Sequence, residues 1–450
     1  MHDATDTRVL QSPPRLSSAL FGQLHHFLRP LLITLDAQID ARLVRTFLAT
    51  IAAILCFRHR NHGLLLSELG AYLSDPAHAP AGTKRLSNLL RSPRWTSAVI
   101  AGWLWDQAST RVQQLVSAGE EVLLAWDESV LEKAESTATP DRCAVRSSKA
   151  ARLKRIRPGF YNPPGGRPIC VPGLHWLALL VLGRSGPPTL ATMQWWTTRG
   201  PRTTDRRTEE CALFERCVTQ WGRAVIHLFD RGFASAAWLC RLLDATVRFV
   251  LRWKKGNKLL DAWGEERKAW EIARGKRSWD ARLLRDSRSG QERKVSVVAL
   301  QVTHPEHARP LWLVVARQGA GHEPWYLLTA DRIETAEAAW RVVLAYARRW
   351  QIEMAWRYTK SELAMESPRV QSWERRLRLL LLVALAYAFL LTLLKPQLAL
   401  VRQTLLRGWC HRTGKRSRET ATPLYRVRSA LSRLWLDYRP SPLLGPGNSG

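Results

Sequence analysis

Two aspartates end short apolar runs of the chain and are the first candidates for chemistry. Asp127 ends the run EVLLAWD, and Asp230 ends the run AVIHLFD. Such runs are typical of buried strands, and open α/β sheets place their ligand crevices at the carboxyl ends of the strands. We therefore expect both carboxylates at one sheet edge. Each aspartate also has a structural alternative. On position alone, Asp127 fits the role of a helix cap as well as a catalytic role, and Asp230 fits the role of a turn residue paired with Arg231.

A third acid lies in a tract with helical spacing. Tyr346, Arg349 and Lys360 are placed at −7, −4 and +7 relative to Glu353, and in a helix these offsets fall along one face. A carboxylate flanked by cations and an aromatic suits a surface that holds both a metal and an anionic backbone. The simpler alternative is a surface salt bridge from Glu353 to Arg349 or Arg357, which does not account for the residues two turns away.

Three separated carboxylates favour Mg²⁺, because this ion prefers hard oxygen ligands and keeps other positions for water and phosphate oxygens. Two such ions about 3.5–4 Å apart activate the attacking oxygen and stabilise the leaving oxygen of a phosphodiester. The seven cysteines form no C-x-x-C pair, which argues against a zinc ribbon or a disulfide framework. The sequence thus predicts two-metal phosphoryl transfer.

At these residues the sequence resembles the bacterial DDE transposases of the IS4 type. The tract Tyr346-x2-Arg349-x3-Glu353-x6-Lys360 matches the Y-(2)-R-(3)-E-(6)-K signature of that group at all four fixed positions. The motifs WDES and FDRGF, which contain the two aspartates, are also similar to those of the family. The resemblance covers roughly residues 120 to 390.

The resemblance implies a set of roles for these residues. Asp127, Asp230 and Glu353 would be the catalytic residues and the ligands of Mg²⁺, with Mn²⁺ as a substitute. The DNA-binding residues near the transposon end would be Tyr346, Arg349, Trp350 and Lys360. Glu128 and Glu132, beside the first aspartate, would be extra ligands or, by default, exposed loop acids.

Trp350 is similar to the aromatic residue that related enzymes use to stabilise a flipped base while a DNA hairpin forms. A packing role for this tryptophan is an equal alternative. The family pattern also implies a second stacking aromatic from the insertion. The sequence leaves this choice open among Trp263, Trp270, Trp279, Trp312 and Trp325.

The order of elements predicts the fold class. Strands alternating with helices indicate an α/β domain, and the resemblance makes it an RNase H-like catalytic core interrupted by a β-rich insertion, with helical N-terminal and C-terminal regions. The expected divisions are a helical N-terminal region that binds DNA (1–118), the first part of the core (119–253), the insertion (254–325), the second part of the core with the glutamate helix (326–395), and a helical C-terminal region with a disordered tail (396–450).

The charge of the chain predicts a polyanionic partner. Lysine and arginine total 68 against 38 acidic residues, a formal net charge of +30. Nucleic acid is the first candidate, and an acidic membrane surface is the second. Lys84 and Arg85 lie on a short basic helix, either one half of a helix-turn-helix or an ordinary solvated helix. Five loop cations would grip phosphate or simply be solvated: Lys149, Arg152, Lys154, Arg155 and Arg157.

The compartment follows from the ends and the apolar runs. The first residues lack the apolar core of a secretory signal, which predicts a cytoplasmic protein. The resemblance implies a bacterial protein associated with the nucleoid. The uncharged run from Leu379 to Leu394 is shorter than a bilayer span, so we expect a buried helix and no membrane partner.

We therefore expect a DNA transposase that cleaves the ends of a mobile element and transfers the strands to target DNA. Its partners would be double-stranded DNA, namely terminal inverted repeats and target, bound by a homodimer. The alternatives are a catalytically silent DNA-binding protein derived from such an enzyme, and an RNase H-like nuclease or resolvase.

Overall fold

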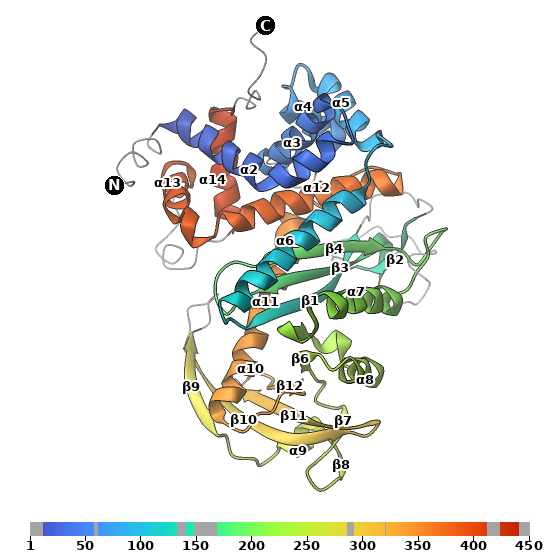
Figure 1. Ribbon diagram of the computed structural model, residues 1–450, viewed down its shortest axis with the longest axis vertical. Helices are drawn as coiled ribbons and strands as arrows, with labels where there is room; N and C mark the ends of the chain where they lie inside the picture. The colour runs from blue at the N-terminus through green and yellow to red at the C-terminus, as the bar shows by residue number, and fades with distance from the viewer. Residues whose placement is uncertain are drawn as a thin grey trace.

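The computed structural model of this protein describes most of the chain, arranged as a helical layer and a large mixed sheet (Figure 1). The described residues are 12–57, 62–132, 141–147, 169–285, 292–319, 321–411 and 424–440. The five loop cations between 149 and 157 and the tail after 440 lie outside these ranges.

Helices from both ends of the chain form the helical layer. They are α2 (Pro13–Asp36), α3 (Ala41–Cys56), α4 (Leu66–Leu73), α5 (Ala79–Arg91), α6 (Ser97–Ser117), α13 (Ala399–Trp409) and α14 (Leu424–Asp437). The first-turn amides of α3 are capped by Asp40, whose carboxylate accepts from the amides of Arg42 and Leu43. The two ends are joined because Arg428 donates to the carbonyl of Phe57, just past the end of α3.

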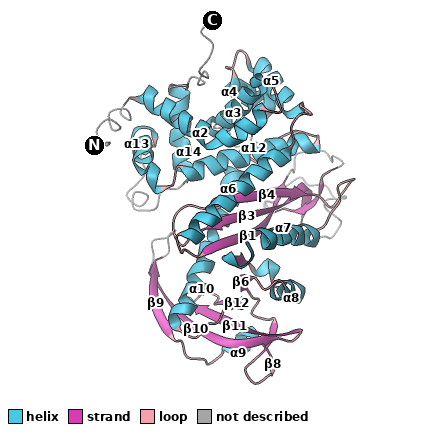
Figure 2. Cartoon of the chain, in the orientation of Figure 1, coloured by secondary structure: helices cyan, strands magenta, loops and turns pink. Residues whose placement is uncertain are grey.

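In the described residues, twelve strands form one central sheet. Figure 2 draws the strands of this sheet in magenta. The strands of its first half are β1 (Val122–Glu132), β2 (Cys143–Arg146), β3 (Cys170–Leu182), β4 (Thr189–Trp196), β5 (Val225–Phe229) and β6 (Arg248–Arg252). β1, β5 and β6 are parallel neighbours, whereas β3 pairs antiparallel with both β1 and β4.

The second half of the sheet is antiparallel. It contains β7 (Lys258–Leu260), β8 (Glu266–Lys268), β9 (Asp280–Arg285), β10 (Glu292–His304), β11 (His307–Arg317) and β12 (Trp325–Thr329), with the short helix α9 (Ala269–Ala273). Since β12 pairs antiparallel with β6, these strands continue the central sheet.

Helices cover both faces of the parallel strands. They are α7 (Arg206–Trp221), α8 (Ala236–Asp244), α10 (Ala336–Arg348), α11 (Trp350–Ser361) and α12 (Trp373–Thr392), and single-turn 3-10 helices occur at Gly222–Ala224, Arg231–Phe233 and Pro396–Leu398. Side chains of β1 alternate between two cores: Trp126 packs in the cluster with α7 and α8, and Ala125 in the cluster with α11 and α12.

The expected buried helix is confirmed. Residues 379–391 of α12 are all buried. No single helix in the described part of the chain is long and apolar enough to cross a membrane; α12 and the segment Pro396–Trp409 pass that test only together, with a bend of 77° between them.

Two expectations from the sequence need correction. Asp127 does not end its strand, because β1 continues to Glu132 by pairing with β3. The single long helix expected around Glu353 is two helices with a break at Arg349. There the amide of Arg349 bonds to the carbonyl of Tyr346, three residues back, which tightens the turn.

Candidate active site

The register of the two parallel strands brings the aspartates to the same level of the sheet. Ala125 of β1 lies opposite Leu228 of β5, and this is the last pair of the parallel ladder. Two residues further along each strand are Asp127 and Asp230. Adjacent strands are about 4.8 Å apart, so the two acids meet where β5 has ended and β1 continues alone on that side.

The turn after β5 fixes the carboxylate of Asp230. Its Oδ1 accepts a hydrogen bond from the amide of Gly232 at 2.8 Å and caps the one-turn helix that follows. A Cβ atom added at Gly232 would lie 2.9 Å from that Oδ1 atom. The FDRG sequence therefore needs its glycine for a close approach between backbone and carboxylate.

Helix α11 supplies the third acid and Trp356, and the residue before it, Arg349, also faces Asp127. The indole Nε1 of Trp356 donates to Oδ2 of Asp127 at 2.9 Å, and Nη1 of Arg349 is 3.8 Å from the same oxygen. Arg349 also forms an ion pair with Glu353, one helical turn away. The guanidinium thus lies between an acid of β1 and an acid of α11.

The protonation of Asp127 is affected by its burial and by the charges around it. Burial raises the pKa of Asp127 to about 7; Arg349 opposes this, while the nearby charges of Asp230 and Glu353 add to it. Burial would lower the pKa of Arg349, but its neighbours Tyr346, Asp127 and Glu353 raise it well above its ordinary value. The guanidinium is therefore held in its charged form.

Carboxylate oxygens are suitable ligands for a hard divalent ion, but the three side chains are not arranged to hold one ion together in this structure. In the described part of the chain, no group of three histidine, cysteine, aspartate or glutamate side chains is gathered to hold a metal ion. Arg349 instead supplies the neutralising positive charge, with its side chain only 9% exposed. Arg349 thus offsets part of the negative charge of Asp127 and Glu353, the two acids with which it pairs.

The other residues of the signature face inward to different degrees. The ring of Tyr346 is buried against Trp325, with centroids 5.1 Å apart, and lies 5.7 Å from the Arg349 guanidinium. Lys360 Nζ donates to Ser129 Oγ at 2.6 Å. In this conformation Tyr346 and Arg349 are buried, so their phosphate contacts stay a prediction that needs a rearrangement.

Trp350 is the signature-region aromatic that faces solvent, with 45% of its surface exposed. Among the five candidates for a second stacking aromatic, Trp312 and Trp325 are partly buried against the core. The exposed ones are Trp263, Trp270 and Trp279.

Lys84 and Arg85 are both exposed on α5. Helices α4 and α5 pack so closely that a Cβ atom at Gly82 would lie 2.1 Å from the carbonyl oxygen of Gly70. In Figure 1 this helix pair is at the top of the molecule, away from strand β1.

Sequence reasoning missed a second polar cluster on the other face of β1. Glu128 and Glu132 are strand residues, not exposed loop acids: Glu128 pairs with Arg206, and the buried Glu132 accepts from Ser147. Arg206 and Glu210 are four residues apart on α7, a spacing that indicates an ion pair but not its contact with β1.

Comparison with known proteins gives one family. Residues 202–389 match the transposase DDE domain. The matched segment contains Asp230 and the whole tract from Tyr346 to Lys360, and it begins after Asp127. The match supports a DDE transposase.

The comparison also covers solved structures and curated proteins. The piggyBac transposase, in a cryo-EM structure of its synaptic complex with hairpin DNA, is 12% identical, with 96% of this chain and 83% of that chain covered and a TM-score of 0.41. No curated protein matches the chain.

Proposed function

We propose that this protein is a DNA transposase of the IS4 type, which cleaves DNA at the ends of a mobile element and joins the freed ends to target DNA with Mg²⁺ or Mn²⁺. One observation carries the proposal: Asp127 and Glu353, from different elements, both pair with Arg349, and the charge of Asp230 acts on both Asp127 and Arg349. Two of these acids lie within the segment that matches the transposase DDE domain.

The topology supports an RNase H-like core. Three parallel strands, β1, β5 and β6, are flanked by the antiparallel strands β3 and β4, and the acids lie beyond the carboxyl end of β5. Strands β7 to β11 then correspond to the proposed insertion, between β6 and its neighbour β12.

The reaction consists of two displacements at phosphorus. In the first, water attacks the phosphodiester at the element's end; the new P–O bond replaces the bond to the 3′ oxygen, which leaves as a hydroxyl. In the second, this 3′-hydroxyl attacks a target phosphodiester and releases a target 3′-hydroxyl. A divalent ion bound by Asp127, Asp230 and Glu353 would polarise the phosphate and neutralise the charge that develops on the oxygens.

The residues around the acids bind and position DNA. After a rearrangement that exposes Tyr346 and Arg349, these two residues and Lys360 contact backbone phosphates of the element's end. The exposed Trp350 offers a face for an unstacked base. Lys84 and Arg85 on α5 bind the duplex away from the catalytic centre. Two ends are brought together by a homodimer on DNA in the bacterial cytoplasm.

A second candidate function is a transposase-derived DNA-binding protein without catalytic activity. It is favoured by one observation: in the described residues the guanidinium of Arg349 pairs with both Asp127 and Glu353, where a metal ion would have to bind. The two candidates agree on DNA binding and differ on whether any strand is cut.

A cleavage assay separates them. The protein is incubated with labelled duplexes that carry the DNA flanking its coding region, with Mg²⁺ or Mn²⁺. Cleavage at specific inverted-repeat ends, absent from Asp230→Asn, supports the transposase. Binding without any nick supports the silent protein, and cleavage governed by branched DNA shape rather than end sequence supports a resolvase.

A further inference from the structure

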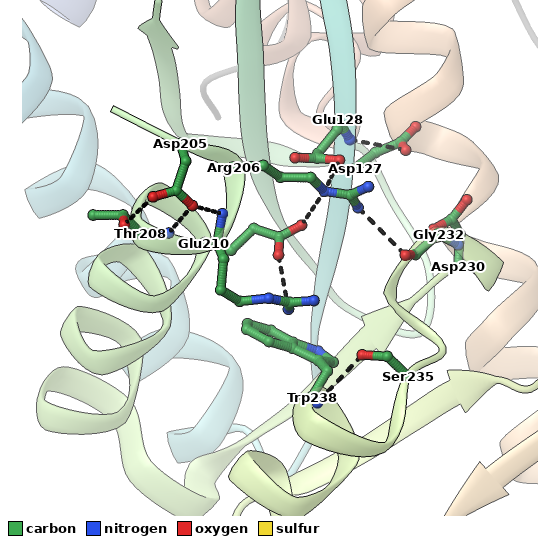
Figure 3. A network of polar contacts seen from close by, with 11 residues as sticks. Asp127, Glu128, Asp205, Arg206, Thr208, Glu210, Asp230, Gly232, Ser235 and Trp238 are labelled. Carbon is green, nitrogen blue, oxygen red and sulfur yellow. Dashed lines mark hydrogen bonds and ion pairs between the residues drawn. The ribbon is translucent and has the colours of Figure 1, made fainter. Parts of the chain in front are cut away.

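Arg206 joins three parts of the chain on the face of β1 opposite the acid cluster (Figure 3). Its Nε atom is 2.6 Å from Oε2 of Glu128 and 2.8 Å from Oε1 of Glu210. Its Nη2 atom donates to the carbonyl oxygen of Gly232 at 3.4 Å. One guanidinium therefore contacts the strand that carries Asp127 and the turn that carries Asp230.

These contacts lie immediately behind both aspartates. Successive strand residues point to opposite faces, so Glu128 faces α7 while Asp127 faces α11. Gly232 is the residue whose amide binds the carboxylate of Asp230. A shift of either anchor of Arg206 would move one aspartate relative to the other.

The base of this cluster is rigid. Arg206 is the first residue of α7, which is capped by Asp205 through the amides of Arg207 and Thr208. Glu210 has a fully buried side chain, and its second oxygen is 2.9 Å from Nη1 of Arg207. Because a buried carboxylate is costly to leave unpaired, Glu210 holds both arginines in place.

We propose that Arg206 is a positioning residue that fixes the separation of Asp127 and Asp230. This inference rests on the proposed function, because it assigns the support of the same site. An arginine is required because its fork reaches two carboxylates and a carbonyl at once, whereas a lysine ammonium is a point charge on a flexible stem. DNA and substrate do not need to touch Arg206 in this role.

The test compares Arg206→Ala, Arg206→Lys and Arg207→Ala. Arg207 is the matched control, since it pairs with the same Glu210 and lies over the ring of Trp238 at 5.0 Å. Three quantities are measured for each protein: the Mn²⁺ concentration for half-maximal cleavage, the Kd for end DNA in EDTA, and the melting temperature. Loss of a residue that orients metal ligands typically weakens metal affinity by about ten- to a hundredfold. Arg206→Ala should therefore raise the Mn²⁺ concentration for half-maximal cleavage, the Mn²⁺ midpoint, about tenfold or more.

The expected pattern is a raised Mn²⁺ midpoint for Arg206→Ala, an intermediate midpoint for Arg206→Lys, and a wild-type midpoint for Arg207→Ala, with end-DNA Kd unchanged in all three. If Arg206→Ala melts at a lower temperature than the wild type, Arg206→Lys still tests the inference, because lysine keeps the positive charge next to Glu128 and Glu210. An unchanged Mn²⁺ midpoint in Arg206→Ala overturns the inference. A rise in the Kd for end DNA that is large enough to explain the whole loss of cleavage also overturns it. A wild-type protein that never cuts DNA instead contradicts the proposed function itself.

Discussion

The indole N–H of Trp356 donates to Oδ2 of Asp127 at 2.9 Å, while the same ring packs edge-on against Trp176 with centroids 4.2 Å apart. Helix α11 thus orients the first aspartate as well as supplying the glutamate. Trp356→Phe keeps an aromatic ring at this position and removes the donor. We expect cleavage to fall by about ten- to a hundredfold, with end-DNA binding unchanged.

The matched control is Trp340→Phe. Its indole donates to Oδ2 of Asp280 at 2.8 Å, so it loses the same kind of hydrogen bond away from the acids. Cleavage rates of the two variants are compared at saturating DNA. Equal losses would mean that the effect of Trp356 is one of general stability.

Arg349 should compete with divalent metal for the acids. Its guanidinium pairs with Glu353 and lies 3.8 Å from Asp127, so Arg349→Gln removes a positive charge from the cluster. In the absence of DNA, Mn²⁺ should bind this variant about tenfold more tightly than the wild type. Electron paramagnetic resonance of free Mn²⁺ measures the difference.

The control is Arg348→Gln, because Arg348 donates to the carbonyl of Gly186 at 2.7 Å rather than to these acids. Tighter Mn²⁺ binding in both variants would point to net charge alone. Equal or weaker binding in Arg349→Gln would show that this arginine does not stand in for the metal.

The buried carboxyl of Asp127 should make stability depend on pH. Burial raises its pKa from 3.8 to about 7, so the folded state favours the protonated form between these values. The free energy of unfolding therefore falls as pH rises through this window. Above pH 7 the folded protein bears the full penalty for a charged, buried carboxylate, on the order of a few kcal/mol. Asp127→Asn removes the cost, so its melting temperature in EDTA should exceed that of the wild type by more at pH 8 than at pH 4.5. An increment independent of pH would contradict this assignment.

Arg378 should be essential for the docking of the helical layer. This buried side chain of α12 donates to the carbonyls of Leu90, Ser92 and Trp95, which follow or end α5. Arg378→Met leaves these buried carbonyls unpaired and should lower the free energy of unfolding by about 3–5 kcal/mol. Urea denaturation measures it, with the exposed Arg407→Met expected to change stability by less than about 0.5 kcal/mol.

The elements and the edge where the two aspartates meet could be predicted from the sequence, because apolar runs of strand length precede both Asp127 and Asp230. The continuation of β1 past Asp127 could not, since it depends on pairing with β3 far along the chain. The spacing of Tyr346 and Arg349 predicted a shared face but not its burial, which comes from packing on Trp325 and the acids. Arg206 has local partners that the sequence shows, but its contact with Gly232 is tertiary.

The central claim is that the three acids act together in cutting DNA, and Glu353→Gln tests it most directly. Glutamine keeps the shape and an oxygen that accepts from Arg349, so end DNA should bind within about twofold of the wild type, while cleavage in Mg²⁺ or Mn²⁺ should fall by more than about a hundredfold. Binding and cleavage are measured on the same labelled end. A Glu353→Gln protein that cuts this DNA at the wild-type rate would contradict the account.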